Sequence, residues 1–340
     1  MKRILIFELN WMGDILFSFP FIRAIRKIFP NAYIECVVVP RYVDLLINTP
    51  WINDVHVLSD SNKFSSISEK IAFIRMIKKE KYDICFFLKP SRIKTVMALL
   101  AGIPERIGFA GKEAPLTKKV EMPSEHMHRA DQILALAGAV GVTQADGTYE
   151  YFLSEEDEER AGILLHGAGG GIRRMVAVNP GGNWEAKRWP TGNFVRLAKG
   201  ILNRFDDVEI MITGSKKDIK IAQDIVSNVR DNRCYMLAGK TGLNELAVLF
   251  KRCSLVISAD SGPLHLASAV GCTTIGLFGP TSYKITGPRG KGENIVIQKD
   301  IDCKVPCYVK TCDRDYICMK AITVNEVFNA AKRVLSSIWR

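Results

Sequence analysis

The sequence predicts an α/β protein built from two doubly wound parallel-sheet domains in tandem. Its 340 residues exceed the size that one hydrophobic core serves well, so two domains of roughly 150 residues are expected. Short continuous apolar runs alternate with amphipathic segments along the chain, a pattern typical of parallel strands covered by helices on both faces. A glycine-rich stretch near the middle separates two such series.

The first series predicts a domain over residues 1–165. Its apolar runs indicate strands, and its amphipathic segments indicate helices. We expect strands at 3–9, 33–39, 55–58, 82–88 and 106–109, and helices at 15–29, 66–79, 94–101, 127–140 and 155–165.

The glycine-rich stretch, 166–171, predicts a hinge over residues 166–174. It holds four glycines in six residues, and no strand precedes it, so it is a poor candidate for a dinucleotide-binding loop. A second domain is expected over 175–322, and a C-terminal helical segment over 323–340 is expected to pack back on the first domain. Within this half we expect strands at 175–179, 208–213, 235–237, 255–258 and 274–278, and helices at 194–204, 218–229, 243–251, 264–270 and 324–339.

The composition favours a protein that works on anionic molecules. The net charge is +11, but the cations are dispersed and not interleaved with aromatic residues, so we expect no nucleic-acid partner. No apolar run approaches the ~20 residues of a membrane span, and the run Ile4 to Phe7 is too short for a signal-peptide core. We expect a cytoplasmic monomer.

The turn after the first strand is the first candidate site. Asn10 to Asp14 leads into a helix, and Gly13 lets the backbone approach a ligand closely. Asp14 is either an ordinary helix N-cap or a carboxylate that deprotonates an acceptor hydroxyl. The residues alone leave both readings open.

Two segments of the second half fit a phosphate group. In the loop 179–190, Gly182 and Asn183 expose backbone N–H groups and Lys187 adds a positive charge; a solvated loop is the alternative. In the segment 258–265, a helix begins at Pro263 or Leu264 after Gly262, so the free N–H groups of its first turn and its dipole form an anion site.

The same segment carries further polar candidates. Ser261 belongs to the anion site, and His265 can donate a hydrogen bond or be structural. Asp260 is awkward beside a phosphate, so it is expected to orient the loop or bind a sugar hydroxyl. Asp218 starts a helix where a carboxylate for ribose hydroxyls is common, with a helix cap as its alternative. Thr241 lies where the backbone could meet an adenine edge.

The nine cysteines divide into two groups. Five lie in or beside predicted strands and helices and behave as small core residues, whereas four cluster within 16 residues. The cluster lacks the two close pairs of a zinc ribbon, and disulfides are disfavoured in a reducing cytoplasm. We expect a loop with reduced cysteines; a structural zinc site is the second alternative and a catalytic metal the weakest. The clustered residues are Cys303, Cys307, Cys312 and Cys318.

Together these motifs resemble glycosyltransferase family 9, the ADP-heptose:lipopolysaccharide heptosyltransferases, and most closely its heptosyltransferase II group. The resemblance covers nearly the whole chain, and the order and spacing of the motifs make it specific. The motifs are Met12-Gly13-Asp14-Ile15, Arg106-Ile107-Gly108-Phe109, Asn179-Pro180-Gly181-Gly182, Lys187-Arg188-Trp189-Pro190, Asp260-Ser261-Gly262-Pro263-Leu264-His265-Leu266-Ala267, Gly279-Pro280-Thr281 and Cys318-Met319.

The resemblance implies a GT-B architecture, in which two Rossmann-like domains face a cleft, and an inverting, metal-independent transfer without a cofactor. The donor would be ADP-L-glycero-D-manno-heptose, bound mainly by the second domain, and the acceptor the lipid A-core at the inner membrane. It implies that Asp14 is the general base beside Gly13 on the acceptor side, and that Lys187 binds the diphosphate. Asp218 would fall on the ribose, where the family usually has Glu, and Thr241 beside the adenine. The remaining donor-binding matches are Gly182, Asn183, Asp260, Ser261, Gly262 and His265, with Ser261 in place of the commoner Thr.

Other functions remain open at this point. The same residues fit a GT-B transferase that uses another nucleotide sugar, a UDP-sugar 2-epimerase, or a protein that binds a sugar nucleotide without turnover. The first heptose, the second heptose and a later sugar are all compatible with the motifs.

Overall fold

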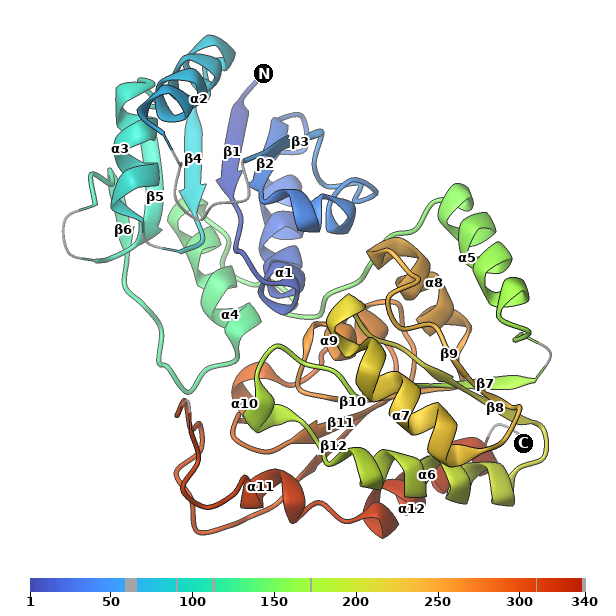
Figure 1. Cartoon of the computed structure of the whole chain (residues 1–340). Coiled ribbons are helices and arrows are strands. Elements are labelled where there is room, and N and C mark those ends of the chain that lie inside the picture. Colours follow the sequence, from blue (N-terminus) through green and yellow to red (C-terminus); the bar gives the residue numbers. More distant parts are fainter. Residues whose placement is uncertain (59–65, 90, 112–113, 172, 310, 338–340) are drawn as a thin grey trace. The chain divides into compact units, whose positions relative to one another are not determined.

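The computed structural model describes residues 1–58, 66–89, 91–111, 114–171, 173–309 and 311–337. Parts of two predictions, Ile172 of the hinge and Trp339 of the last helix, lie outside these residues. The chain divides into two compact units, Met1–Tyr149 and Glu150–Arg340, and each is described by itself (Figure 1).

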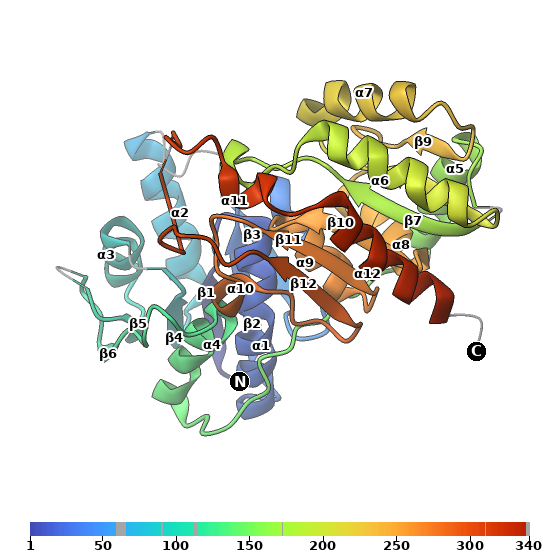
Figure 2. The same ribbon diagram turned by 90° about the horizontal axis from the view of Figure 1, so that it is seen from below.

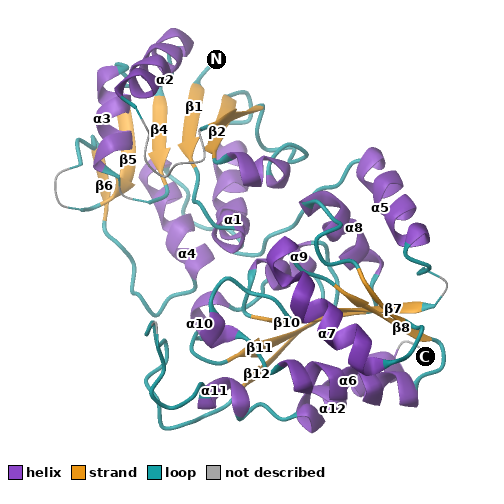
Figure 3. Ribbon diagram, viewed as in Figure 1, coloured by secondary structure: helices purple, strands orange, loops and turns teal. Residues whose placement is uncertain are grey.

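The first unit contains a six-stranded parallel sheet with the order β3-β2-β1-β4-β5-β6. Figure 3 shows its strands with helices along both faces. The strands are β1 (Arg3–Phe7), β2 (Tyr33–Val38), β3 (Asp54–Val57), β4 (Ile84–Phe87), β5 (Glu105–Phe109) and β6 (Lys118–Val120). The helices are α1 (Met12–Ile28), α2 (Ile67–Glu80), α3 (Arg92–Leu100) and α4 (Arg129–Leu134), with 3-10 turns η1 (Pro40–Leu45) and η2 (Ala135–Val140).

Alternate side chains of the central strands build two separate cores. Phe86 of β4 meets the ring of Phe21 of α1 at 5.1 Å, whereas Phe87 points to the other face and stacks on Phe7 at 5.2 Å. Phe73 of α2 and Met97 of α3 complete this second core. The chain adds β2 and β3 on one side of β1 and β4 to β6 on the other. Because crossovers between parallel strands are right-handed, the helices of the two halves cover opposite faces of the sheet, and each face has its own core.

The second unit repeats the architecture with the strand order β12-β11-β10-β7-β8-β9, again all parallel. Its strands are β7 (Arg174–Asn179), β8 (Val208–Ile212), β9 (Cys234–Met236), β10 (Leu255–Ala259), β11 (Thr274–Phe278) and β12 (Asn294–Gln298). Its helices are α5 (Glu155–Gly167), α6 (Thr191–Arg204), α7 (Ile219–Val229), α8 (Leu243–Arg252), α9 (Gly262–Ala269), α10 (Tyr283–Thr286), α11 (Ile317–Lys320) and α12 (Val324–Ser337), with short turns η3 (Glu185–Lys187) and η4 (Lys216–Asp218).

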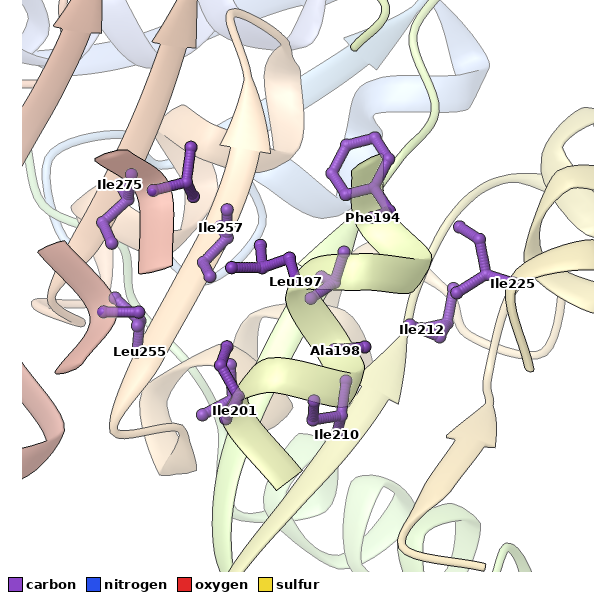
Figure 4. Packing of buried hydrophobic residues seen from close by; sticks show 14 of the residues in the cluster. Phe194, Leu197, Ala198, Ile201, Ile210, Ile212, Ile225, Leu255, Ile257 and Ile275 are labelled. Carbon is purple, nitrogen blue, oxygen red and sulfur yellow. The ribbon is translucent and has the colours of Figure 1, made fainter. Parts of the chain in front are cut away.

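Helix α6 supplies the centre of this unit's core. Its buried residues recur at the spacing of one helix face, and they pack on the isoleucines of β8 and β10 (Figure 4). The residues of the helix face are Phe194, Leu197, Ala198 and Ile201, and the strand residues are Ile210, Ile212 and Ile257.

The division between the units differs from the expected one. It falls at Tyr149 and Glu150, not at residue 165, and α5 belongs to the second unit, where Arg160 bonds Glu245 of α8 at 2.8 Å. The glycine segment is a close-packed turn inside the second unit. The N–H of Gly171 donates to Glu209 at 2.5 Å, and a Cβ on Gly170 would lie 2.2 Å from the Tyr235 hydroxyl.

The C-terminal helix also belongs to the second unit. In Figure 2, α12 runs beside α6, and it packs on α6, β10 and β11. Arg174 of β7 donates to the carbonyl of Leu335 at 2.7 Å. These contacts explain why the segment stays with the second sheet: its apolar face completes that sheet's core.

Candidate functional site

The strongest cluster of polar residues in the second unit lies at the carboxyl ends of β7 and β10, which are neighbouring strands. Lys187 follows β7 in the short turn η3, and Asp260 directly follows β10. The Nζ of Lys187 lies 2.7 Å from Oδ2 of Asp260. The sequence motifs placed both residues at this edge, and the fold joins them in an ion pair.

Asp260 is the anchor of the cluster. Its side chain is 4% exposed, His265 Nε2 lies 3.4 Å from its Oδ1, and the Thr286 hydroxyl lies 3.3 Å from its Oδ2. Burial alone would raise the pKa of Asp260, but the hydrogen bond from His265 and the charge of Lys187 outweigh burial and hold it well below its usual range. Asp260 is therefore a carboxylate at any working pH, and it fixes the two cationic or donor groups beside it.

The start of α9 offers a free donor next to this anchor. Ser261 is extended, with φ −152°, and its side chain does not cap the helix. It instead lies 3.0 Å from the hydroxyl of Ser258. The Leu264 N–H bonds the Ser261 carbonyl at 3.1 Å, whereas the Gly262 N–H bonds no residue that the structure describes. A helix start with a free N–H is an anion-binding feature.

A buried amide connects the backbone segments of the site. Asn179, the last residue of β7, is 2% exposed. Its Nδ2 lies 3.4 Å from the hydroxyl of Ser258 and 3.4 Å from the carbonyl of Gly181. Its Oδ1 accepts from Thr213 of the next loop at 3.3 Å. The amide thus links β10 to the loops after β7 and β8.

Asp218 directly precedes α7 but makes no side-chain hydrogen bond that caps this helix; its carboxylate instead closes the short turn η4. Its Oδ2 accepts from the Ser215 N–H at 2.9 Å and from the Ser215 hydroxyl at 2.6 Å, which is a capping box. Gly181 touches this carboxylate so closely that a Cβ there would lie 2.4 Å from Cγ. Oδ1 makes no hydrogen bond with the residues that the structure describes, so the cap leaves one oxygen for a ligand.

The remaining donor-side candidates lie in loops at the same edge of the second sheet. Gly182 is held through its carbonyl, which accepts from Arg188 at 3.0 and 2.7 Å, and Asn183 is exposed. Thr241 lies half-exposed in the turn before α8. Gly239 has φ +75° in that turn, a left-handed conformation that glycine adopts without strain.

In the first unit, Asp14 does not cap α1. The N-cap is Trp11, and Gly13 and Asp14 are the second and third residues of the helix. A carboxylate in the first turn is stabilised by the helix dipole. Just before this turn, Arg41 donates to the carbonyl of Asn10 at 3.1 Å, so the loop of η1 holds the backbone that leads to Asp14.

Comparison with known proteins identifies the family. The profile of glycosyltransferase family 9 (heptosyltransferase) matches residues 70–317. The chain belongs to this family. It is 25% identical over 306 residues to lipopolysaccharide heptosyltransferase 2 of Escherichia coli K12, covering 86% of this chain and 87% of that protein. It is 26% identical over 317 residues to lipooligosaccharide heptosyltransferase 2 of Haemophilus influenzae, covering 86% and 88%.

Solved structures agree on the fold. The family 9 glycosyltransferase of Veillonella parvula DSM 2008 superposes with a TM-score of 0.87 at 24% identity, covering 99% of this chain and 97% of that one. ADP-heptose lipopolysaccharide heptosyltransferase II of E. coli gives 0.83 at 24% identity and covers both chains completely. The predictions of family, of a GT-B architecture with two Rossmann-like sheets, and of a glycosyltransferase are confirmed.

The candidate site contains residues that the motifs did not single out. Thr286 of α10 contacts Asp260. Asn179 belongs to one of the motifs, but the sequence analysis gave it no role of its own. Trp184 stacks on Tyr308 with ring centroids 6.4 Å apart, and the Lys187 ammonium lies 5.7 Å from the Trp184 ring. The contacts of Thr286 with Asp260 and of Trp184 with Tyr308 are not visible in the sequence, because the partners lie more than 20 residues apart.

Glu8 is a further residue that the sequence analysis passed over. It follows β1, is 2% exposed, and accepts from the Leu9 N–H at 3.2 Å and from the Ser18 hydroxyl at 3.0 Å. Burial raises the pKa of Glu8 to about 7, against the opposing effects of these two bonds and of the Lys94 charge. It ties the start of the Asp14 loop to α1.

The four clustered cysteines are partly exposed, and none of them forms a disulfide with a described residue. Arg314 donates to Cys303 Sγ at 3.1 Å, and burial raises the pKa of Cys318. Among the residues that the structure describes, no group of three or more His, Cys, Asp or Glu side chains is arranged to hold a metal ion. In the same part of the chain, no helix has the length and apolarity needed to cross a bilayer.

Proposed function

We propose that this glycosyltransferase moves a heptose from ADP-L-glycero-D-manno-heptose to the inner core of lipopolysaccharide. Two relatives with this kind of acceptor in their names match along most of the chain. The observation that carries the proposal is that a cation and a free backbone donor follow neighbouring strands. The Lys187 ammonium follows β7, and the free N–H of Gly262 follows β10. A diphosphate requires such a combination of a cation and backbone donors.

In this proposal the second unit binds the donor. Lys187 and the start of α9, with Ser261 and Gly262, stabilise the negative charge that develops on the diphosphate as the bond to the anomeric carbon breaks. His265 adds a donor that Asp260 orients. Asp218 offers its free Oδ1 to the ribose, Thr241 contacts the adenine, and Gly182 and Asn183 present backbone N–H groups. The transfer needs neither a metal nor another cofactor.

The first unit supplies the base. The acceptor hydroxyl oxygen forms the new bond to the anomeric carbon on the face opposite the diphosphate, so the configuration inverts and ADP leaves. Asp14 takes the hydroxyl proton, and Gly13 leaves room for the acceptor sugar. The enzyme would act as a cytoplasmic monomer, peripheral to the inner membrane, where the lipid A-core acceptor is embedded.

Transfer from ADP-heptose to heptose-truncated lipopolysaccharide tests the proposal, with wild type compared with Asp14→Asn. We expect kcat to fall roughly 100- to 10,000-fold, the contribution of a general base, while the affinity for ADP is unchanged. Asp54→Asn is the matched control, because Asp54 is exposed at the start of β3. Transfer from another nucleotide sugar but not from ADP-heptose would overturn the donor. Nucleotide binding without any transfer would indicate a silent binding protein.

A further inference from the structure

Helix α3 of the first unit exposes large apolar side chains on its outward face, beside the exposed Arg92 at its start. Met97 and Ala98 point into the core, whereas Ile93, Leu99 and Leu100 are 47%, 45% and 60% exposed. Large exposed apolar side chains gathered on one helix are typical of an interaction surface. The outward face of α3 therefore fits an apolar environment.

Helix α2 extends this face and adds positive charge. It packs beside α3 on the same side of the sheet (Figure 1). Ile67 and Ile71 are exposed in its first half, and Arg75, Lys78 and Lys79 are exposed in its second half. These three cations form no ion pair with a described residue. We call the outward faces of α2 and α3 the α2–α3 face.

We propose that the α2–α3 face docks on the surface of an anionic lipid bilayer. Apolar side chains that enter the headgroup region, with cations beside them for anionic lipids, are the two features of an interfacial membrane-binding helix. A second copy of the chain fits less well. A two-fold interface would bring the same cations of both copies together without a counter-charge.

The face lies on the same sheet as Asp14. Helix α3 starts at the carboxyl end of β4, and α1 with Asp14 starts at the carboxyl end of the neighbouring strand β1. Ile93 is therefore near this edge, whereas Leu99 and Leu100 end α3, and Lys78 and Lys79 end α2, toward the amino ends of the strands. Docking would hold the membrane along this flank of the sheet. That an acceptor reaches Asp14 from this side rests on the proposed function, which takes the acceptor to be embedded in lipid; the docking itself does not.

Vesicle flotation of the full chain tests the docking without donor or acceptor. Wild type is expected to bind vesicles that contain phosphatidylglycerol, to bind phosphatidylcholine vesicles weakly, and to dissociate as salt is raised. Lys78→Gln with Lys79→Gln should weaken binding roughly twenty- to thirtyfold, since each cation near such a surface contributes about fivefold. Leu99→Ser with Leu100→Ser should weaken it about tenfold or more.

The matched control is Ile163→Ser. Ile163 is 68% exposed, but it lies on α5 of the second unit, whose first turn is acidic, so its loss should leave vesicle binding unchanged. Both pairs of substitutions should also leave transfer to a water-soluble, deacylated acceptor unchanged, which shows that the variants are folded.

Three results would overturn the docking. One is undiminished vesicle binding by both paired variants. Another is equal loss of binding in the Ile163 variant. The third is a wild-type dimer in sedimentation that Leu99→Ser with Leu100→Ser dissociates, because the face would then be an interface between copies. If transfer from ADP-heptose fails while vesicle binding follows the expected pattern, the donor assignment is wrong and the docking stands.

Discussion

Replacement of Asp260 by Asn should destabilise the second unit in a pH-dependent manner. The amide keeps the shape of the carboxylate but loses its charge, so the 2.7 Å contact with Lys187 and the 3.4 Å contact with His265 are weakened. Hydrogen bonds to charged groups contribute about 1.5–3 kcal/mol. Because the Lys187 side chain is 24% exposed and can turn to water, we expect a loss near the lower end, about 2 kcal/mol.

The direction of the pH dependence follows from the depressed pKa of Asp260. A carboxylate with a lowered folded-state pKa stabilises the fold above its unfolded pKa of about 4, and this contribution is lost as the pH falls further toward the folded value. The free energy of unfolding of wild type should therefore exceed that of the variant at pH 7, and the difference should shrink below about pH 4.

Thiol labelling in urea measures the two units separately. Cys253 and Cys272 are buried in the second unit, and Cys36 and Cys85 are buried in the first. Asp260→Asn should speed the labelling of the first pair and leave the second pair unchanged. A Thr286→Val control removes only a 3.3 Å bond to Asp260 and should cost less than about 1 kcal/mol.

Two results would refute this account of Asp260. A difference in unfolding free energy that is the same at pH 7 and at low pH would show that the carboxylate has no depressed pKa. Equal acceleration of labelling in both units would show that the substitution acts on the chain as a whole and not through the Lys187 pair.

Two other substitutions test neighbouring features. Glu8→Gln should remove a pH dependence from the first unit: the raised pKa of about 7 means that wild type loses stability as the pH rises through 7, by up to about 3 kcal/mol. The variant should unfold at nearly the same urea concentration at pH 5 and pH 8, and a persistent slope would contradict the assignment to Glu8. Gly181→Ala should destabilise the second unit by roughly 1–3 kcal/mol in thermal melts, because its Cβ would lie 2.4 Å from Asp218 Cγ. Gly182→Ala has open space and should melt like wild type; equal melting of both variants would refute the close contact.

The central strands could be predicted from the sequence, and so could two of the four edge strands, β3 and β9. The runs that became β1, β4, β7, β10 and β11 are apolar on both faces, a signal that needs no tertiary knowledge. Of the two edge strands that the sequence analysis missed, β6 is short and holds two lysines, so it carries no such signal and becomes a strand because β5 offers free backbone groups. The other, β12, contains the apolar run Ile295 to Ile297 and could have been predicted.

The boundary between the two units differs from the expected one for another reason. Glycines at 166–171 were interpreted as a hinge, since glycine is typical of flexible linkers. Here Gly170 and Gly171 are required because Tyr235 and Leu165 leave no room for a Cβ. Close packing and flexibility select the same residue type, so composition alone could not separate them.

The principal residues of the candidate site could be predicted from the sequence, but the contacts between them could not. Spacing placed Lys187 and Asp260 at strand ends, but their ion pair depends on β7 and β10 being neighbours although they are separated by β8 and β9 in the sequence. Thr286 joins them only because α10 follows β11. The order of strands in space, which a single sequence does not encode locally, decides these contacts.

These connections bear on how a diphosphate would enter the proposed site. Lys187 is already engaged by Asp260, so an incoming phosphate competes with a buried carboxylate for the same ammonium. Asp260 would not be left unsatisfied if Lys187 turned away, because His265 and Thr286 each keep a contact with one of its oxygens. A buried charge that retains two partners after losing one avoids most of the penalty of an unpaired ion. The arrangement therefore lets the lysine change partners at small cost, whereas a carboxylate held by Lys187 alone would oppose binding.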